Sequence, residues 1–175
     1  MNAPRPAIID ASVAVAIVRK EPEGATAATA ISRLTRDGAR MVVPAHFWLE
    51  VANALIRRRH WSGETVLQAI HDLDRLRLET IELDRALLVL VIDLSERHRL
   101  TPYDAAYLAL ADSLDGSLMT LDAVLRGAAG ARALPVGLAR LSESSAVYEQ
   151  DVTWPNYKGA SAFLAKLRAE AIRSL

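Results

Sequence analysis

Short apolar runs along the chain alternate with longer segments in which apolar positions recur at helical spacing. The short runs have the length of strands and occupy Ala7–Ile9, Met41–Val43, Leu78–Leu83, Ser117–Thr120 and Leu134–Leu138. The segments with helical spacing are Ser12–Lys20, Ala25–Arg36, Ala45–Arg59, Ser62–Leu76, Arg85–His98, Pro102–Leu114 and Ala123–Ala129. Strands that alternate with helices predict an α/β fold, in which a central parallel sheet is flanked by helices.

The pattern changes after Leu141. Ser142–Lys158 is polar, whereas Ala160–Leu175 has apolar residues at helical spacing and predicts an amphipathic helix. We therefore expect one domain over residues 1–141 and a C-terminal extension over residues 142–175. The simplest role of the extension is to pack against the domain.

Composition excludes several classes of function. The chain has 175 residues, of which 51% are hydrophobic, enough for one domain with a substantial core. It has no cysteine, which excludes disulfides, thiol catalysis and cysteine-ligated zinc. Because Lys+Arg and Asp+Glu both number 21, the net charge leaves a nucleic-acid partner open. Without a long apolar run or a signal-peptide pattern, the sequence predicts a cytoplasmic protein with no membrane partner.

Two acidic residues follow predicted strands. Asp10 comes directly after the first strand, and Asp122 comes two residues after Thr120 in the fourth. Ligands of open parallel sheets bind at the carboxyl ends of the strands. We assume the strand order 3-2-1-4-5, in which the first and fourth strands are neighbours, so that Asp10 and Asp122 would flank one crevice.

Two further acidic residues lie on predicted helices. Glu50 belongs to an otherwise apolar helix, where a carboxylate is costly unless a metal or Arg57 pairs with it. Asp104 is the third residue of a helix that begins after Thr101, and a helix N-terminus favours an ionised carboxylate.

Carboxylates that are brought together repel one another, so either some become protonated or a divalent cation neutralises them. Oxygen ligands favour Mg²⁺ or Mn²⁺. An ion of this kind polarises a phosphodiester and lowers the pKa of a bound water. If the four acids converge, they therefore predict a nuclease site.

Each acid also has an ordinary structural explanation. Asp10 and Asp122 could cap the helices that follow them. Asp104 could complete a Thr-x-x-Asp capping box with Thr101. Glu50 could be a solvated residue or an ion-pair partner. The sequence by itself leaves these alternatives open.

Several other residues are candidates for supporting roles. Ser12 and Thr120 each lie two residues from an acid and could orient its carboxylate or touch a phosphate, although capping is the simpler role for Ser12. Asn53 shares a helical strip with Glu50 and could orient it or the substrate, or only face solvent. Arg57 and Arg58 belong to a basic run that could contact RNA phosphates or form a basic helix C-terminus.

The order and spacing of four segments resemble the PIN-domain family, and within it the VapC-type toxins of bacterial toxin–antitoxin pairs. The segments are Ile8–Ser12, Glu50–Leu55, Leu100–Ala111 and Leu118–Asp122. The resemblance extends from Ala7 to Leu141 and implies a three-layer α/β sandwich. It also implies Mg²⁺- or Mn²⁺-dependent endonuclease cleavage of RNA.

The family's acidic positions map onto four residues of this chain, which would be both catalytic residues and metal ligands: Asp10, Glu50, Asp104 and Asp122. We expect the three aspartates to ligate the metal and Glu50 to ligate it or orient the attacking water. The resemblance further implies a homodimer and inhibition by a small VapB-like antitoxin whose C-terminal segment lies over the site. Such a toxin would inhibit translation. The alternatives are a housekeeping PIN nuclease in RNA processing and a non-catalytic binding module.

Overall fold

The computed structural model describes residues 4–136, and its centre is a four-stranded sheet. The strands are β1 (Ala7–Ile9), β2 (Met41–Pro44), β3 (Glu79–Ile81) and β4 (Ser117–Met119). They are parallel and lie in the order β3-β2-β1-β4. The predicted α/β class and the predicted order of the first four strands are therefore confirmed.

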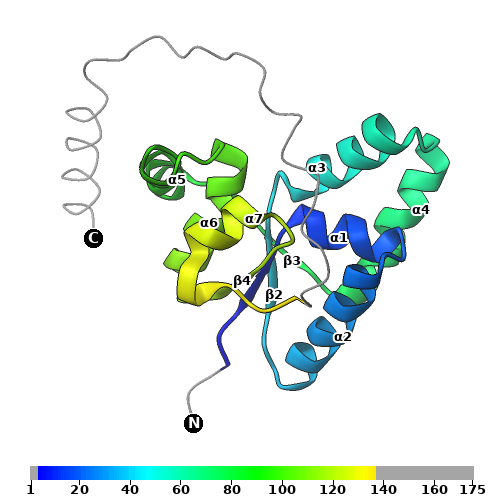
Figure 1. The fold of residues 1–175 in the computed structure, drawn as a ribbon, viewed down its shortest axis with the longest axis horizontal. Helices are drawn as coiled ribbons and strands as arrows, with labels where there is room; N and C mark the ends of the chain where they lie inside the picture. Colours follow the sequence, from blue (N-terminus) through cyan, green and yellow to red (C-terminus); the bar gives the residue numbers. More distant parts are fainter. Residues whose placement is uncertain (1–3, 137–175) are drawn as a thin grey trace.

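Helices cover both faces of the sheet. The first four lie on one face and the last three on the other (Figure 1). Their bounds are α1 (Ala11–Val18), α2 (Pro22–Arg36), α3 (Phe47–Asn53), α4 (Gly63–Leu73), α5 (Arg85–His98), α6 (Pro102–Ser113) and α7 (Ala123–Ala129). A π-helical segment over Ala54–Arg58 continues α3, and short 3₁₀ turns over Asp74–Leu76 and Gly130–Arg132 follow α4 and α7.

The predicted fifth strand is wrong within the described residues. Beside β4 the chain forms one parallel bridge, between Leu118 and Ala133, and the Leu134 N–H donates to the Leu118 carbonyl at 2.7 Å. The next residue is Pro135, which has no N–H with which to extend the ladder. Within the described residues the sheet therefore has four strands, and the segment expected to form a fifth contacts β4 at this one bridge.

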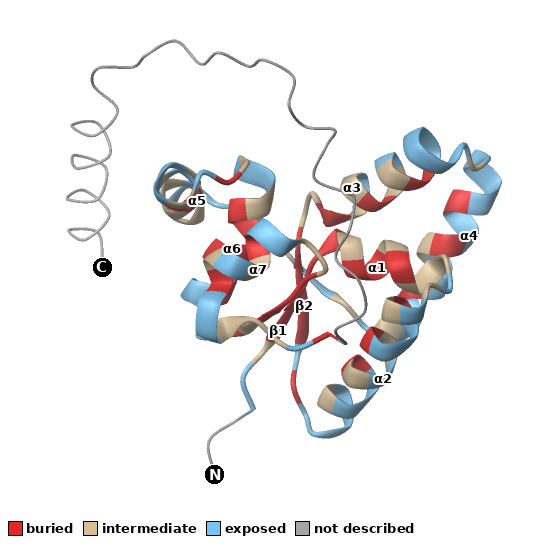
Figure 2. Cartoon of the chain, in the orientation of Figure 1, coloured by how far each residue is buried: buried red, intermediate tan, exposed pale blue. Residues whose placement is uncertain are grey.

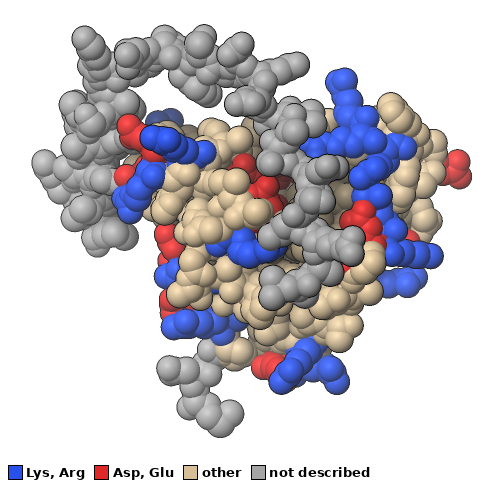
Figure 3. All heavy atoms as spheres, viewed as in Figure 1, with Lys and Arg blue, Asp and Glu red and all other residues tan. Residues whose placement is uncertain are grey.

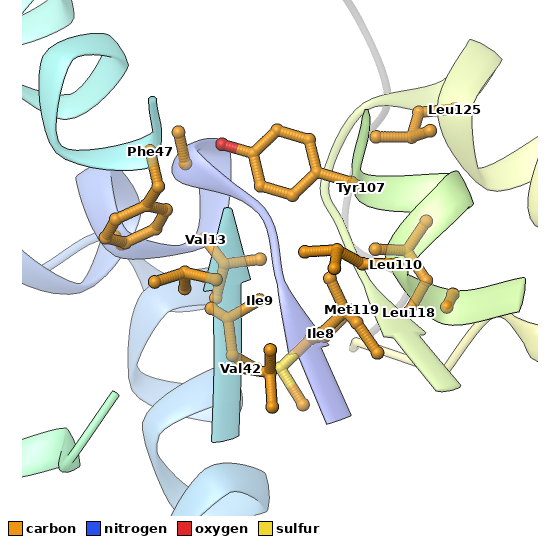
Figure 4. Packing of buried hydrophobic residues seen from close by; sticks show 14 of the residues in the cluster. Ile8, Ile9, Val13, Val42, Phe47, Tyr107, Leu110, Leu118, Met119 and Leu125 are labelled. Atoms are coloured by element: carbon orange, nitrogen blue, oxygen red, sulfur yellow. The ribbon is translucent and has the colours of Figure 1, made fainter. Parts of the chain in front are cut away.

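The hydrophobic core joins the strands of the sheet to α6. Ile8 and Ile9 of β1 and Val42 and Val43 of β2 are fully buried, as expected for parallel strands covered on both faces. The Ala105–Ala111 stretch of α6 is buried throughout (Figure 2). In Figure 4, Ile8 lies on the α6 side of the sheet near Leu110, and Ile9 lies on the opposite side near Val13. Because α6 lies so close to the sheet, its N-terminus is fixed at the carboxyl ends of the strands.

The crossing of α1 and α2 depends on Gly24. A Cβ at this position would lie 2.2 Å from the carbonyl oxygen of Ala16, a backbone atom that cannot turn aside. We expect Gly24→Ala to destabilise the protein by about 2–3 kcal/mol through overpacking. Gly127→Ala is the matched control in α7, since nothing lies within 4 Å of its Cβ, and alanine favours a helix. Urea unfolding measures both; equal stability of the two variants would contradict this account of the crossing.

No helix within residues 4–136 is long and apolar enough to cross a membrane. The predicted extension over residues 142–175, with its helix at Ala160–Leu175, lies outside the described residues.

Candidate active site

Asp10 lies at the carboxyl end of β1 and is 5% exposed. It occupies the N-cap position of α1, but its side chain makes no capping hydrogen bond. Its Oδ2 instead accepts hydrogen bonds from the Ser12 hydroxyl and, at 2.7 Å, from the Thr120 hydroxyl. The Asp10 carboxylate therefore does not cap α1, and it is held by the Ser12 and Thr120 hydroxyls instead.

The two hydroxyls also tie β1 to the segment after β4. The Ser12 hydroxyl oxygen accepts the N–H of Leu121 at 3.1 Å, and that of Thr120 accepts the N–H of Asp122 at 3.0 Å. Ser12 and Thr120 thus orient the Asp10 carboxylate and fix the chain that leads to Asp122. The contacts of the Ser12 hydroxyl support this orienting role instead of the capping role that was predicted as simpler.

The capping explanations hold for the other two aspartates. Asp122 Oδ1 accepts the Leu125 N–H at 2.8 Å and caps α7. The Thr101 hydroxyl donates to Asp104 Oδ2 at 2.6 Å and accepts the Asp104 N–H at 3.1 Å. These contacts hold both carboxylates at helix N-termini on the same edge of the sheet as Asp10.

Glu50 is held by residues that the sequence did not single out. The Tyr107 hydroxyl donates to Glu50 Oε2, and His46 Nε2 lies 3.5 Å from the same oxygen. Figure 4 shows the Tyr107 ring extending from α6 across the end of β1. Arg57, one of the alternative partners considered for Glu50, is exposed, and the side chains beside the Glu50 carboxylate are Tyr107 and His46. Tyr107 could have been found from its position one helical turn after Asp104.

Burial and the neighbouring carboxylates raise the pKa values of three of the four acids. Burial, followed by repulsion from Asp104 and Asp122, raises the pKa of Asp10 to about 6. Burial, followed by repulsion from Asp10 and Asp104, raises the pKa of Glu50 to about 7. Burial and repulsion from Asp122 raise the pKa of Asp104 as well. We call Asp10, Glu50, Asp104 and Asp122 the acidic cluster.

The chemistry of the acidic cluster fits a divalent cation. Its donors are carboxylate oxygens, which Mg²⁺ and Mn²⁺ prefer. Within the described residues, no lysine or arginine is among the causes that shift the pKa of Asp10, Glu50 or Asp104. In the same part of the chain, no three His, Asp or Glu side chains are arranged as they stand to hold an ion. Some carboxylates would therefore have to turn away from their present hydrogen bonds to share one.

The remaining candidates are exposed residues of α3 and of the π-helical segment that follows it. The exposed Asn53 side chain makes no hydrogen bond within residues 4–136, which agrees with the alternative in which it faces solvent. Arg57 and Arg58 are exposed in the π-helical segment after α3. In Figure 3, one group of Lys and Arg atoms lies on the side of the molecule where α3 and α4 lie, and other basic atoms are spread over the rest of this face, with acidic atoms both near its centre and at its margins.

The chain is similar to known proteins both in sequence and in fold. The sequence profile of the family described as PIN domain matches residues 7–131, which include all four acids. Among solved structures, that of PAE2754 from Pyrobaculum aerophilum is similar, with a TM-score of 0.54 and 20% identity over 74% of this chain and 83% of that chain. This likeness concerns the fold. No curated protein matches the chain.

Proposed function

Because the chain belongs to the PIN domain family, whose members are generally nucleases, we propose that it is a Mg²⁺- or Mn²⁺-dependent endoribonuclease. The observation that carries the proposal is the acidic cluster at the carboxyl edge of the sheet, in which burial and neighbouring carboxylates raise the pKa values of Asp10, Glu50 and Asp104. Bringing these charges together costs free energy, and a divalent cation would recover it.

The four acids have distinct positions in this proposal. Asp10, Asp104 and Asp122 would hold the cation, and Glu50 would ligate it or orient the attacking water. The bound cation would stabilise negative charge on the phosphodiester and lower the pKa of a water. Ser12 and Thr120 hold the Asp10 carboxylate, and Tyr107 holds that of Glu50. These hydrogen bonds hold Asp10 and Glu50 at the edge of the sheet, from which some carboxylates would turn to share the cation.

We further propose that the protein is the toxin of a toxin–antitoxin pair and inhibits translation. The VapC-like segments Glu50–Leu55 and Leu100–Ala111 support this. A homodimer, a small VapB-like antitoxin, and RNA contacts through Arg57 and Arg58 belong to the same proposal. A housekeeping PIN nuclease is the alternative. Expression in a bacterial host separates them: a toxin arrests growth, and co-expression of the gene directly upstream restores it.

The nuclease proposal is tested with total RNA and purified protein in Mg²⁺, in Mn²⁺ and in EDTA. We expect discrete cleavage in either metal, no cleavage in EDTA, and none by Asp104→Asn. Cleavage that survives both EDTA and the substitution would mean that another site acts. Absence of cleavage by folded, antitoxin-free protein in both metals would favour a non-catalytic binding module.

Tyr107→Phe tests how Glu50 is held. The variant removes the hydroxyl that donates to Glu50, and this hydrogen bond lowers the pKa of Glu50 against the effect of burial. We expect cleavage to fall by about tenfold, the size of one lost hydrogen bond to a charged group, and its pH profile to move to higher pH. A pH profile identical to that of the wild type would show that the hydroxyl has no such role.

A further inference from the structure

A pocket of about 520 Å³ lies over the carboxyl ends of β2 and β3, beside the acidic cluster. Its size is in the range of small-ligand sites. It is formed by the segments after these strands, by α5 and by the start of α6, and is lined by Ala45, His46, Glu82, Leu83, Leu88, Val91, Pro102 and Tyr103. His46 lies beside Glu50, and the other lining residues have no role in the proposed nuclease mechanism.

Two residues join the pocket to the acidic cluster. His46 lines the pocket, yet its Nε2 lies 3.5 Å from Glu50 Oε2. Tyr103 lines it too and directly precedes Asp104 in the chain. A group inside the pocket is therefore next to the carboxylates, separated from them only by these side chains. One nucleotide could place its base in the pocket and its phosphate at the acids.

The walls of the pocket suit a flat, largely apolar group. Tyr103 is 59% exposed, and its ring meets the His46 ring edge-on, with centroids 5.6 Å apart. His46 in turn meets the buried Tyr107 ring at 5.3 Å, which fixes the aromatic wall to the core. Leu88 is 44% exposed on the opposite side, on α5. An exposed aromatic face beside apolar side chains is the usual platform for an unstacked base.

Glu82 is the carboxylate among the lining residues, and it is exposed. An ionised carboxylate only accepts hydrogen bonds. It favours adenine, cytosine or guanine, which carry an exocyclic amino group, over uracil, whose ring N3–H lies between two carbonyl oxygens that repel the carboxylate.

We propose that this pocket binds one unstacked base of the RNA substrate, beside the phosphodiester that is cleaved. Tyr103 stacks on the base, and Glu82 selects a base with an exocyclic amino group. The inference rests on the proposed function, and it names the residues that would set the sequence preference of the same site.

The test measures binding and cleavage separately with the full chain. Fluorescein-labelled decamers of adenosine, cytidine and uridine are titrated by anisotropy with Ca²⁺ in place of Mg²⁺, and cleavage of the same decamers is followed in Mg²⁺. The variants are Tyr103→Leu, Tyr103→Phe and Glu82→Gln. Leu67→Ala is the control, because Leu67 is 69% exposed on α4 and does not line the pocket.

We expect the wild type to bind the adenosine and cytidine decamers about tenfold more tightly than the uridine decamer, the scale of one good base contact. Tyr103→Leu weakens binding of adenosine and cytidine by about tenfold, the loss of one stacking contact, whereas Tyr103→Phe and Leu67→Ala bind as the wild type does. Glu82→Gln removes most of the preference over uridine. Wild-type affinity in Tyr103→Leu, or an unchanged preference in Glu82→Gln, would overturn the proposal.

The two proposals fail in different ways in this experiment. Binding with the expected base preference but without cleavage in Mg²⁺ or Mn²⁺ supports the pocket and overturns the nuclease. Cleavage without any base preference supports the nuclease and overturns the pocket. Absence of binding to every decamer overturns both.

Discussion

Replacement of Asp10 by asparagine is expected to abolish RNA cleavage and, at the same time, to stabilise the metal-free protein at pH 8. Activity should fall by about a thousandfold or more, the usual scale for loss of a central catalytic group. Stability should rise because Asp10 is buried and its neighbours Asp104 and Asp122 repel its charge. Asparagine has nearly the same shape, and its carbonyl oxygen can still accept from Ser12 and Thr120.

The size of the stabilisation follows from the pKa of Asp10. A rise from 3.8 to about 6 corresponds to about 3 kcal/mol of destabilisation of the charged form, so a gain of about 1–3 kcal/mol is expected. Thermal unfolding in EDTA at pH 8 measures it, and Asp37→Asn, at an exposed helix end, is the control. A less stable Asp10→Asn variant would show that the charge of Asp10 is already compensated in the metal-free protein.

The second large effect is a loss of stability of the metal-free protein as pH rises from 5 to 8. Asp10 and Glu50 have raised pKa values, about 6 and about 7, so the folded protein holds protons that the unfolded chain has released. Their contribution to stability is complete below about pH 4 and is lost as pH rises through these values. The loss should total about 3 kcal/mol after allowance for the partial exposure of Glu50.

Mg²⁺ should reverse this loss at high pH and have little effect at pH 5. The cation binds ionised carboxylates, which are scarce in the cluster at pH 5 and abundant at pH 8. Urea unfolding at pH 5, 6.5 and 8, in EDTA and in millimolar Mg²⁺, checks both statements. The account would be contradicted by a stability that rises towards pH 8 in EDTA. It would also be contradicted by a stability at pH 8 that does not change when Mg²⁺ is added. The same measurements on Asp10→Asn should show a weaker response to pH and to Mg²⁺.

The fold was predictable where local pattern and packing agree. Ala7–Ile9 is an apolar run that forms the fully buried central strand β1, and the run Ser117–Thr120 contains β4 (Ser117–Met119), whose Leu118 and Met119 are buried. Leu78–Leu83 alternates over a longer stretch, but only Glu79–Ile81 pairs, because β3 is an edge strand with one neighbour. The π-helical turn at Ala54–Arg58 has the same apolar spacing as an α-helix, so a sequence pattern does not distinguish the two.

The candidate site was predictable to a different degree for each residue. The acids were found because strand ends and helix starts place them at one edge of the sheet. Ser12 and Thr120 were found because each lies two residues from an acid. The partners of Glu50 were missed, since Tyr107 lies on another helix and only tertiary packing brings it near. The alternative in which Arg57 pairs with Glu50 is not the one formed, because residues two helical turns apart share a strip without being in contact.

Location of the cation tests the central claim most directly. Crystals grown without metal are soaked in Mn²⁺, and its anomalous scattering locates each bound ion. The account predicts a peak in contact with Asp10 and at least one of Asp104 and Asp122, and no such peak in Asp10→Asn crystals. Well-ordered crystals with Mn²⁺ bound only elsewhere, or not at all, would contradict the claim that the acidic cluster is a divalent metal site.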